Sequence, residues 1–265
     1  MSLVSHELNS ARKTTILWSL ALSSLAVGFL LMYPVFTKDL ATANQVFENI
    51  PSALKSALNI STDMLGSVTG FFSYLMQFIL LAGSVMALVI GLKSLSQEET
   101  NKTADFLLTK PITRSQIVSA KLKVSIFSLL LTNIFFSLVA FITANLVSEN
   151  QFSSKTFLLL LGSLLLVQLL FFSLGLVLSA SLGKIKSVVS LAMPIAFSFF
   201  IISALDSAIG NINLAALTPF KFFSSTYIVQ NSAYETKYLV LSIGLFLGFI
   251  WLAYYFYNRR DINSA

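Results

Sequence analysis

The 265-residue chain contains no cysteine, a single histidine and only 11% charged residues. The lack of cysteine excludes disulfide bonds and thiolate metal sites. Because His6 is the only histidine and the apolar segments hold no carboxylate pair, we expect no metal cluster. The phosphate-binding motif G-x-x-x-x-G-K-[ST] is also absent. We therefore predict that the chain is not itself an ATP-hydrolysing enzyme and carries no cofactor of its own.

The scarcity of charge points to a membrane protein. Soluble domains contain roughly 25% charged residues, whereas this chain is 56% hydrophobic with a mean hydropathy of +0.83. Apolar runs of about 20 residues recur, which is the length of a membrane-spanning helix, and the short alternating strands of an outer-membrane barrel are missing. The sequence predicts an all-α, polytopic membrane protein.

Six apolar segments are long enough to span the bilayer. We expect them to form a single transmembrane domain over residues 1–265, with spans at about residues 14–35, 68–92, 123–147, 157–182, 187–209 and 238–257. An even number of spans places both termini on one side of the membrane.

The distribution of Lys and Arg predicts which side that is. Twelve of the 17 basic residues fall on the side of the termini, and the other five are Lys38, Lys55, Lys155, Lys221 and Lys237. Basic residues are enriched in cytoplasmic loops, so both termini are expected in the cytoplasm of a cell membrane, by inference the bacterial cytoplasmic membrane. The formal charge of +6 then follows from topology and does not indicate nucleic-acid binding.

A polar segment between the second and third spans is the most informative part of the chain. Ser96 and Glu99 have the spacing of a capping box, which predicts the start of a helix over residues 97–109 that ends before Pro111. Charged and apolar side chains would lie on opposite faces of this helix. Thr113 and Gln116 repeat the capping-box pattern and predict a long helix that continues to about Val147.

Three other segments carry predictions. Residues 3–13 have a weak amphipathic pattern and are expected to form an interfacial helix at the cytoplasmic surface, with a frayed terminus as the alternative. Pro51 predicts a short helix in the first outer connection. Residues 210–237 are too apolar for a free loop, so we expect them to pack into the outer leaflet or re-enter it. The Lys184-Ile185-Lys186 turn is a possible second cytoplasmic contact.

Ionisable side chains are almost absent from the centres of the spans. Proton relays and ion carriers need such groups at depth. A secondary transporter or channel that works without ATP is therefore disfavoured as an interpretation of this chain. Another alternative is a membrane scaffold that recruits an ATPase.

The polar segment resembles the loop after the second span of ABC-2 type permeases, the membrane subunits of ATP-binding cassette exporters. The residues that carry the resemblance are Glu98, Glu99, Thr103, Leu107, Leu108, Pro111, Ile112, Arg114, Ile117 and Lys121, together with Pro219-Phe220 and the closing run from Tyr257 to Ile262. One departure is Lys102, where the family often has glycine. Lysine is the better helix former and lies four residues after Glu98.

The resemblance implies a function and partners. A separate ATPase subunit, in two copies and holding ATP and magnesium, would dock on the segment, and a second permease, identical or related, would complete the transporter. The expected docking residues are Glu98, Glu99, Lys102, Thr103, Phe106, Leu107, Leu108, Pro111 and Arg114. The uncharged spans favour export of an amphipathic or lipophilic substrate such as a peptide, an antibiotic or a lipid. Substrate-binding residues are not identified by the sequence.

Overall fold

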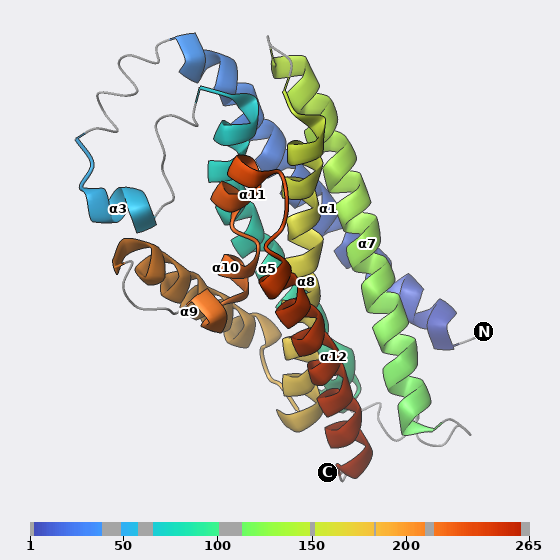
Figure 1. Ribbon diagram of the computed structural model, residues 1–265. Helices are drawn as coiled ribbons and strands as arrows, with labels where there is room; N and C mark the ends of the chain where they lie inside the picture. Colours follow the sequence, from blue (N-terminus) through green and yellow to red (C-terminus); the bar gives the residue numbers. More distant parts are fainter. Residues whose placement is uncertain are drawn as a thin grey trace.

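The computed structural model describes residues 3–38, 49–57, 66–100, 113–148, 152–182, 184–209 and 215–260. Within these ranges every regular element is a helix and no strand occurs. The long helices are α1 (Leu3–Lys38), α5 (Val68–Thr100), α7 (Arg114–Val147), α8 (Ser154–Leu182), α9 (Val188–Ile209) and α12 (Thr236–Arg259). All six are long and apolar enough to cross a membrane, which confirms the predicted all-α polytopic fold (Figure 1).

Short helices occupy the described connections on the side away from the termini. They are α3 (Ser52–Ala57), the 3-10 helix η1 (Ala215–Leu217), α10 (Pro219–Phe222) and α11 (Ser225–Asn231). The helix predicted near Pro51 is confirmed: α3 starts at the next residue, and the Leu54 and Lys55 amides donate to the Pro51 carbonyl at 2.9 and 3.0 Å.

The first helix is longer than its predicted span. Residues 3–13 are helical as expected, but they continue without a break into the first span and so belong to α1, not to a separate interfacial helix. The sequence offers a reason, since residues 3–27 contain neither glycine nor proline to end a helix. The Glu7 carboxylate in these first turns lies 3.2 Å from the Lys121 ammonium of α7.

The start of α7 is as predicted. The Thr113 hydroxyl accepts from the Gln116 amide at 3.3 Å, and the Gln116 side-chain oxygen accepts from the Thr113 amide at 3.0 Å. This reciprocal capping box satisfies two backbone donors that would otherwise have no partner in the helix. From there α7 runs for 34 residues without interruption. At 1.5 Å per residue its length is roughly 50 Å, well beyond the thickness of the hydrocarbon core.

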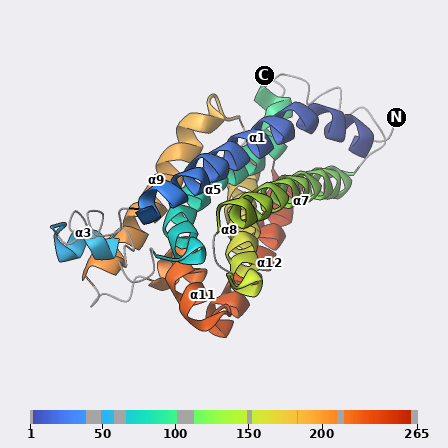
Figure 2. The same cartoon turned by 90° about the horizontal axis from the view of Figure 1, so that it is seen from above.

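Helices α5 and α8 form the centre of the bundle, as both views show (Figures 1 and 2). Their most apolar windows are 72% and 61% buried, against 11% for α9 and for α12. Two glycines let the central pair approach closely. A Cβ atom added to Gly175 would lie 2.9 Å from the Leu88 carbonyl oxygen, and one added to Gly91 would collide with the Phe172 carbonyl. The backbones of the two helices are therefore in direct contact.

Polar side chains inside the bundle join the helices across the apolar core. The Asn133 amide of α7 donates to the Gln168 side-chain oxygen of α8 at 2.6 Å, and Ser19 of α1 donates to Thr132 of α7 at 3.1 Å. Gln168 also donates to the sulfur of Met86 on α5 at 3.7 Å. Hydrogen bonds of this kind hold membrane helices together where lipid supplies no hydrophobic driving force.

The described part of the connection between α9 and α12, residues 215–235, packs against the bundle, which accounts for its apolar composition; its expected place in the outer leaflet stays a prediction. Phe220, Phe222 and Phe223 are buried, and the Phe220 ring lies 5.1 Å from that of Phe171 and 5.8 Å from that of Phe200. The Lys221 ammonium lies 3.3 Å from the Asp206 carboxylate, so Asp206 takes part in a partly buried ion pair between α10 and α9. Its charge is balanced within the chain.

Candidate functional site

The helix start that the sequence pattern indicated at Ser96 is not present in the structure. Ser96 does not cap a new helix, because α5 continues through it to Thr100. The Ser96 hydroxyl is buried and donates to the Leu92 carbonyl one turn earlier, at 2.6 Å. A serine whose hydroxyl donates to the carbonyl one turn earlier can remain inside a helix, although serine is also a common N-cap residue. The expected boundary at Ser96 is therefore wrong.

This difference changes the assignment of the first docking residues. The backbone of Glu98 and Glu99 belongs to the last turns of α5. Other predicted docking residues lie in the segment 101–112, outside the described residues: Lys102, Thr103, Phe106, Leu107, Leu108 and Pro111. Both flanks of that segment are described, by Thr100 before it and by Thr113 and Arg114 after it.

Arg114, the first residue of α7, contacts the end of α12. Its guanidinium Nη1 donates to the carbonyl oxygens of Asn258 at 3.2 Å and Tyr257 at 3.5 Å, and to that of Arg260. The last carbonyls of a helix have no partner within it and carry the negative end of the helix dipole. Arg114 therefore binds the carboxyl end of α12, directly after the predicted docking segment.

Arg260 makes the same kind of contact with a different helix. Its Nη1 lies 3.4 Å from the Ser179 carbonyl and 3.5 Å from the Ala180 carbonyl, in the last turn of α8. The neighbouring Arg259 is placed differently, with its guanidinium 4.3 Å from the centre of the Tyr255 ring. Of these two consecutive arginines, Arg260 thus links α12 to α8, whereas Arg259 stacks on its own helix.

The turn between α8 and α9 contacts the other flank of the segment. The Thr100 hydroxyl lies 3.3 Å from the Ile185 carbonyl oxygen, and the Ile185 side chain is buried. Lys184 and Lys186 on either side of it are exposed. The predicted second contact therefore lies against the last residue of α5, with its two ammonium groups free to meet a partner.

These contacts gather on the end of the bundle that holds both termini, here called the terminal end (Figure 1). The sequence pattern named Arg114, Ile185 and the closing Arg259-Arg260 pair, but gave no partners for them. Thr100 and the carbonyl acceptors on α8 and α12 went unrecognised, because a backbone oxygen at a helix end leaves no signal in composition or periodicity.

The whole chain was then compared with known proteins. Residues 1–262 match the family model described as ABC-2 family transporter protein. The chain belongs to the ABC-2 transporter family. No curated protein matched the chain. The family consists of membrane components of ABC transporters, which are not themselves enzymes and generally work with ABC ATPases.

Membership agrees with the features already described. An ABC-2 family permease is a multi-pass membrane protein, and six helices of this chain are suited to span a membrane. Among the described residues, no three His, Cys, Asp or Glu side chains come together to hold a metal ion.

Proposed function

We propose that this chain is the permease subunit of an ABC exporter in which a separate ATPase docks on the segment between α5 and α7. The observation that carries the proposal is that each flank of this segment contacts another part of the bundle, a turn between two helices on one side and the end of a helix on the other. Thr100 contacts the turn before α9, and Arg114 contacts the end of α12. A push on a segment connected in this way reaches several spans at once.

The terminal end faces the cytoplasm in this proposal. Twelve of the 17 Lys and Arg residues belong to that side of the sequence, as the positive-inside rule requires. The same end of the bundle holds both termini, both flanks of the docking segment and the turn with Lys184 and Lys186 (Figure 1). A soluble ATPase would thus meet all the candidate contact residues from one direction.

Docking would use the two kinds of side chain that the segment contains. Thr103, Phe106, Leu107 and Leu108 supply apolar groups for a groove in the partner, while Glu98, Glu99 and Lys102 set its orientation at the rim. Lys184 and Lys186 form the second, smaller contact. Two permeases, identical or related, assemble with two ATPases, which hold the ATP and magnesium.

Movement would pass from the docking segment to the spans through the contacts at its flanks. ATP-driven closure of the ATPases displaces the segment, Arg114 carries the displacement to α12, and Thr100 carries it to the turn between α8 and α9. The substrate crosses between permeases as an amphipathic or lipophilic molecule, in keeping with spans whose centres lack charge.

Charged substitutions in the docking segment test this function. Phe106→Glu with Leu107→Glu should abolish co-purification of the ATPase subunit with the full-length permease, because both apolar anchors are lost. Asn101→Glu, which the helical pattern of the sequence puts on the expected charged face, is the control and should leave co-purification intact. Normal ATPase binding by the double variant would refute docking at this segment.

A second measurement asks whether ATP moves the spans. The chain contains no cysteine, so a Leu247→Cys variant, whose parent side chain is 59% exposed on α12, gives a single site for a thiol reagent. Its labelling rate in the assembled complex should change when ATP is added and return when the nucleotide is removed. An unchanged rate, with flux of a fluorescent lipid analogue that needs no ATP, would favour a secondary transporter or channel instead.

A further inference from the structure

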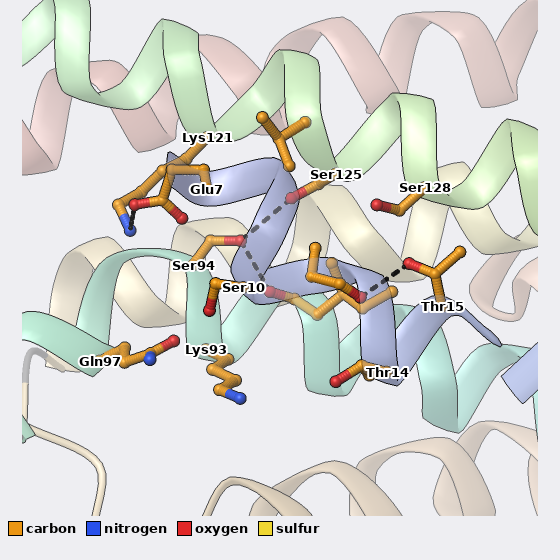
Figure 3. Close-up of a pocket in the computed structure, with 13 residues that line it drawn as sticks. Glu7, Ser10, Thr14, Thr15, Lys93, Ser94, Gln97, Lys121, Ser125 and Ser128 are labelled. Atoms are coloured by element: carbon orange, nitrogen blue, oxygen red, sulfur yellow. Dashed lines mark hydrogen bonds and ion pairs between the residues drawn. The ribbon is translucent and has the colours of Figure 1, made fainter. Parts of the chain in front are cut away.

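A polar cavity lies between α1, α5 and α7 near the terminal end (Figure 3). The volume of the cavity that water-sized groups can occupy is about 70 Å³. A single water needs roughly 10–15 Å³ on this scale, so the cavity has room for about five such groups. Ten of its thirteen lining residues have a polar or charged side chain, which is unusual between helices this apolar.

The cavity wall contains one buried ion pair. Glu7 from α1 and Lys121 from α7 lie 3.2 Å apart, with side chains that are 21% and 3% exposed. Their charges balance each other. Lys93 of α5 also lines the cavity and forms neither an ion pair nor a hydrogen bond within the described part of the chain. The cavity therefore carries a net positive charge that comes from Lys93.

Several other polar groups in the wall also have unused hydrogen-bonding capacity. Ser10 and Thr14 from α1, Gln97 from α5 and Ser128 from α7 make no hydrogen bond among the described residues, and all four line the cavity. Figure 3 shows these side chains around a common space, beside the paired Ser94 and Ser125 hydroxyls. Hydroxyl and amide donors next to a lysine are the groups that bind phosphate oxygens.

The cavity sits at the level where charged residues give way to apolar ones. On α1 the exposed Arg12 and Lys13 are followed by exposed Ile16 and Leu17. On α5 Lys93 is the first charged residue after the apolar span, and on α7 residues 124–147 contain no charge. Phospholipid headgroups occupy this level, where lysine side chains extend from apolar helices toward them. The apolar faces beyond the cavity suit acyl chains.

We infer that this cavity binds the phosphate group of a phosphoester, with Lys93 as the charge partner and the free hydroxyl and amide groups as donors. A membrane phospholipid and a soluble phosphate ester share this chemistry, and the test separates them. The inference concerns a site apart from the docking segment and does not depend on ATP coupling.

The test measures lipid binding to the purified, delipidated full-length chain by native mass spectrometry. The probes are dioleoyl phosphatidylglycerol and dioleoylglycerol, which has the same acyl chains and no phosphate. We expect Lys93→Gln to weaken phosphatidylglycerol binding about tenfold and Lys93→Arg to retain it, since one charge-assisted phosphate contact is lost in the first variant and kept in the second. Dioleoylglycerol binding should be the same for all variants.

Lys123→Gln is the matched control, because Lys123 is an exposed lysine on α7 that does not line the cavity. An equal loss in Lys93→Gln and Lys123→Gln would overturn the inference, since only general surface attraction would remain. Equal binding of the two probes by the unmodified chain would overturn it as well. Competition by glycerol phosphate would support the site and identify a soluble ester as its ligand; lack of competition alongside the Lys93 effect would identify the lipid.

Discussion

Helices α5 and α9 are equally apolar and yet occupy opposite situations in the bundle. Both have a mean hydropathy of 2.3 in their most apolar window, but that window is 72% buried in α5 and 11% buried in α9. Helix α5 contacts α8 along its backbone through Gly91 and Gly175. Helix α9, like α12, leaves most of its surface uncovered within the chain. The bundle thus consists of a tightly packed centre and outer helices that contact it less.

The outer helices make polar contacts near their ends and, in α9, also at the middle of the helix. Arg114 and Arg260 connect α12 to α7 and α8 at the terminal end. Lys221 contacts Asp206 near the far end of α9, and the Thr218 hydroxyl donates to the Phe199 carbonyl at 3.0 Å. Helices joined in this way can shift against the centre by exchanging a few hydrogen bonds. A shift between α5 and α8 would require their close-packed backbones to separate.

The largest effect is expected where the central helices touch. Gly91→Val should prevent stable folding or cost about 3 kcal/mol, because the added side chain meets the α8 backbone, which has no room to yield. Thermal unfolding in detergent measures this. Gly248→Val on α12 is the control, since no described residue lies within 4 Å of a Cβ added there. Equal destabilisation by both variants would remove the distinction between centre and periphery.

A smaller effect is expected at the polar contact within the core. Gln168→Leu should destabilise the chain by about 1 kcal/mol, because the hydrogen bond from Asn133 is lost and its buried amide keeps only the Leu129 carbonyl as acceptor. The double change Asn133→Leu with Gln168→Leu should recover part of that loss. The Asn133 side-chain oxygen already lacks a partner among the described residues, so removing it carries little penalty. If the stability losses of the two single variants simply added up in the double variant, Asn133 and Gln168 would not share a stabilising hydrogen bond.

The arginine contacts should affect coupling more than stability. Arg260→Gln and Arg114→Gln are each expected to cost about 1 kcal/mol or less in unfolding free energy, the usual value of a cation at a helix end. Both should reduce the ATP-dependent labelling change of the Leu247→Cys site on α12, and Arg260→Gln should do so while the ATPase still co-purifies. Arg259→Gln, which removes the same charge one residue away, should leave the change intact. If the labelling change were reduced in all three variants, the loss of a positive charge would explain the effect without the contacts at the helix ends.

The smallest effect is a pH dependence outside the spans. Burial raises the pKa of Tyr234 to about 12 from its ordinary value of 10.0, and its hydroxyl donates to the Leu159 carbonyl at 2.7 Å. Between pH 10 and 12 the unfolded phenol loses its proton while the folded one keeps it, so stability falls as pH rises. The stability advantage over Tyr234→Phe should therefore shrink across this interval. A constant difference would contradict the raised pKa.

Features that depend on neighbouring residues were predictable from the sequence. The Thr113–Gln116 capping box and the long helix after it were found where expected, since a cap involves residues three positions apart. The same pattern at Ser96 gave a wrong prediction, because the Ser96 hydroxyl donates to the Leu92 carbonyl within a helix that continues past it. A local pattern permits both outcomes. The burial of Ser96 against its neighbours decided between them.

The small residues of the spans show a similar limit. Gly244 and Gly248 form a G-x-x-x-G pair, the usual signature of close helix packing, but nothing in the described part of the chain lies within 4 Å of a Cβ atom added to either. The close approach occurs instead at Gly91 and Gly175, which belong to different spans and share no sequence motif. Close contact between two helices requires small residues on both helices at matching heights. The sequence of one span shows the small residues of that helix but not which helix faces them.

The sequence alone thus determined the six helical spans, the all-α class and the unusual polar segment after the second span, because hydropathy and helix capping act over a few residues. It also supplied the family resemblance that residues 1–262 bear out. Only the tertiary structure decided which spans are central, which glycines touch and which carbonyls Arg114 and Arg260 bind. In a bilayer every span is apolar, so hydropathy places helices in the membrane, and packing alone determines their neighbours.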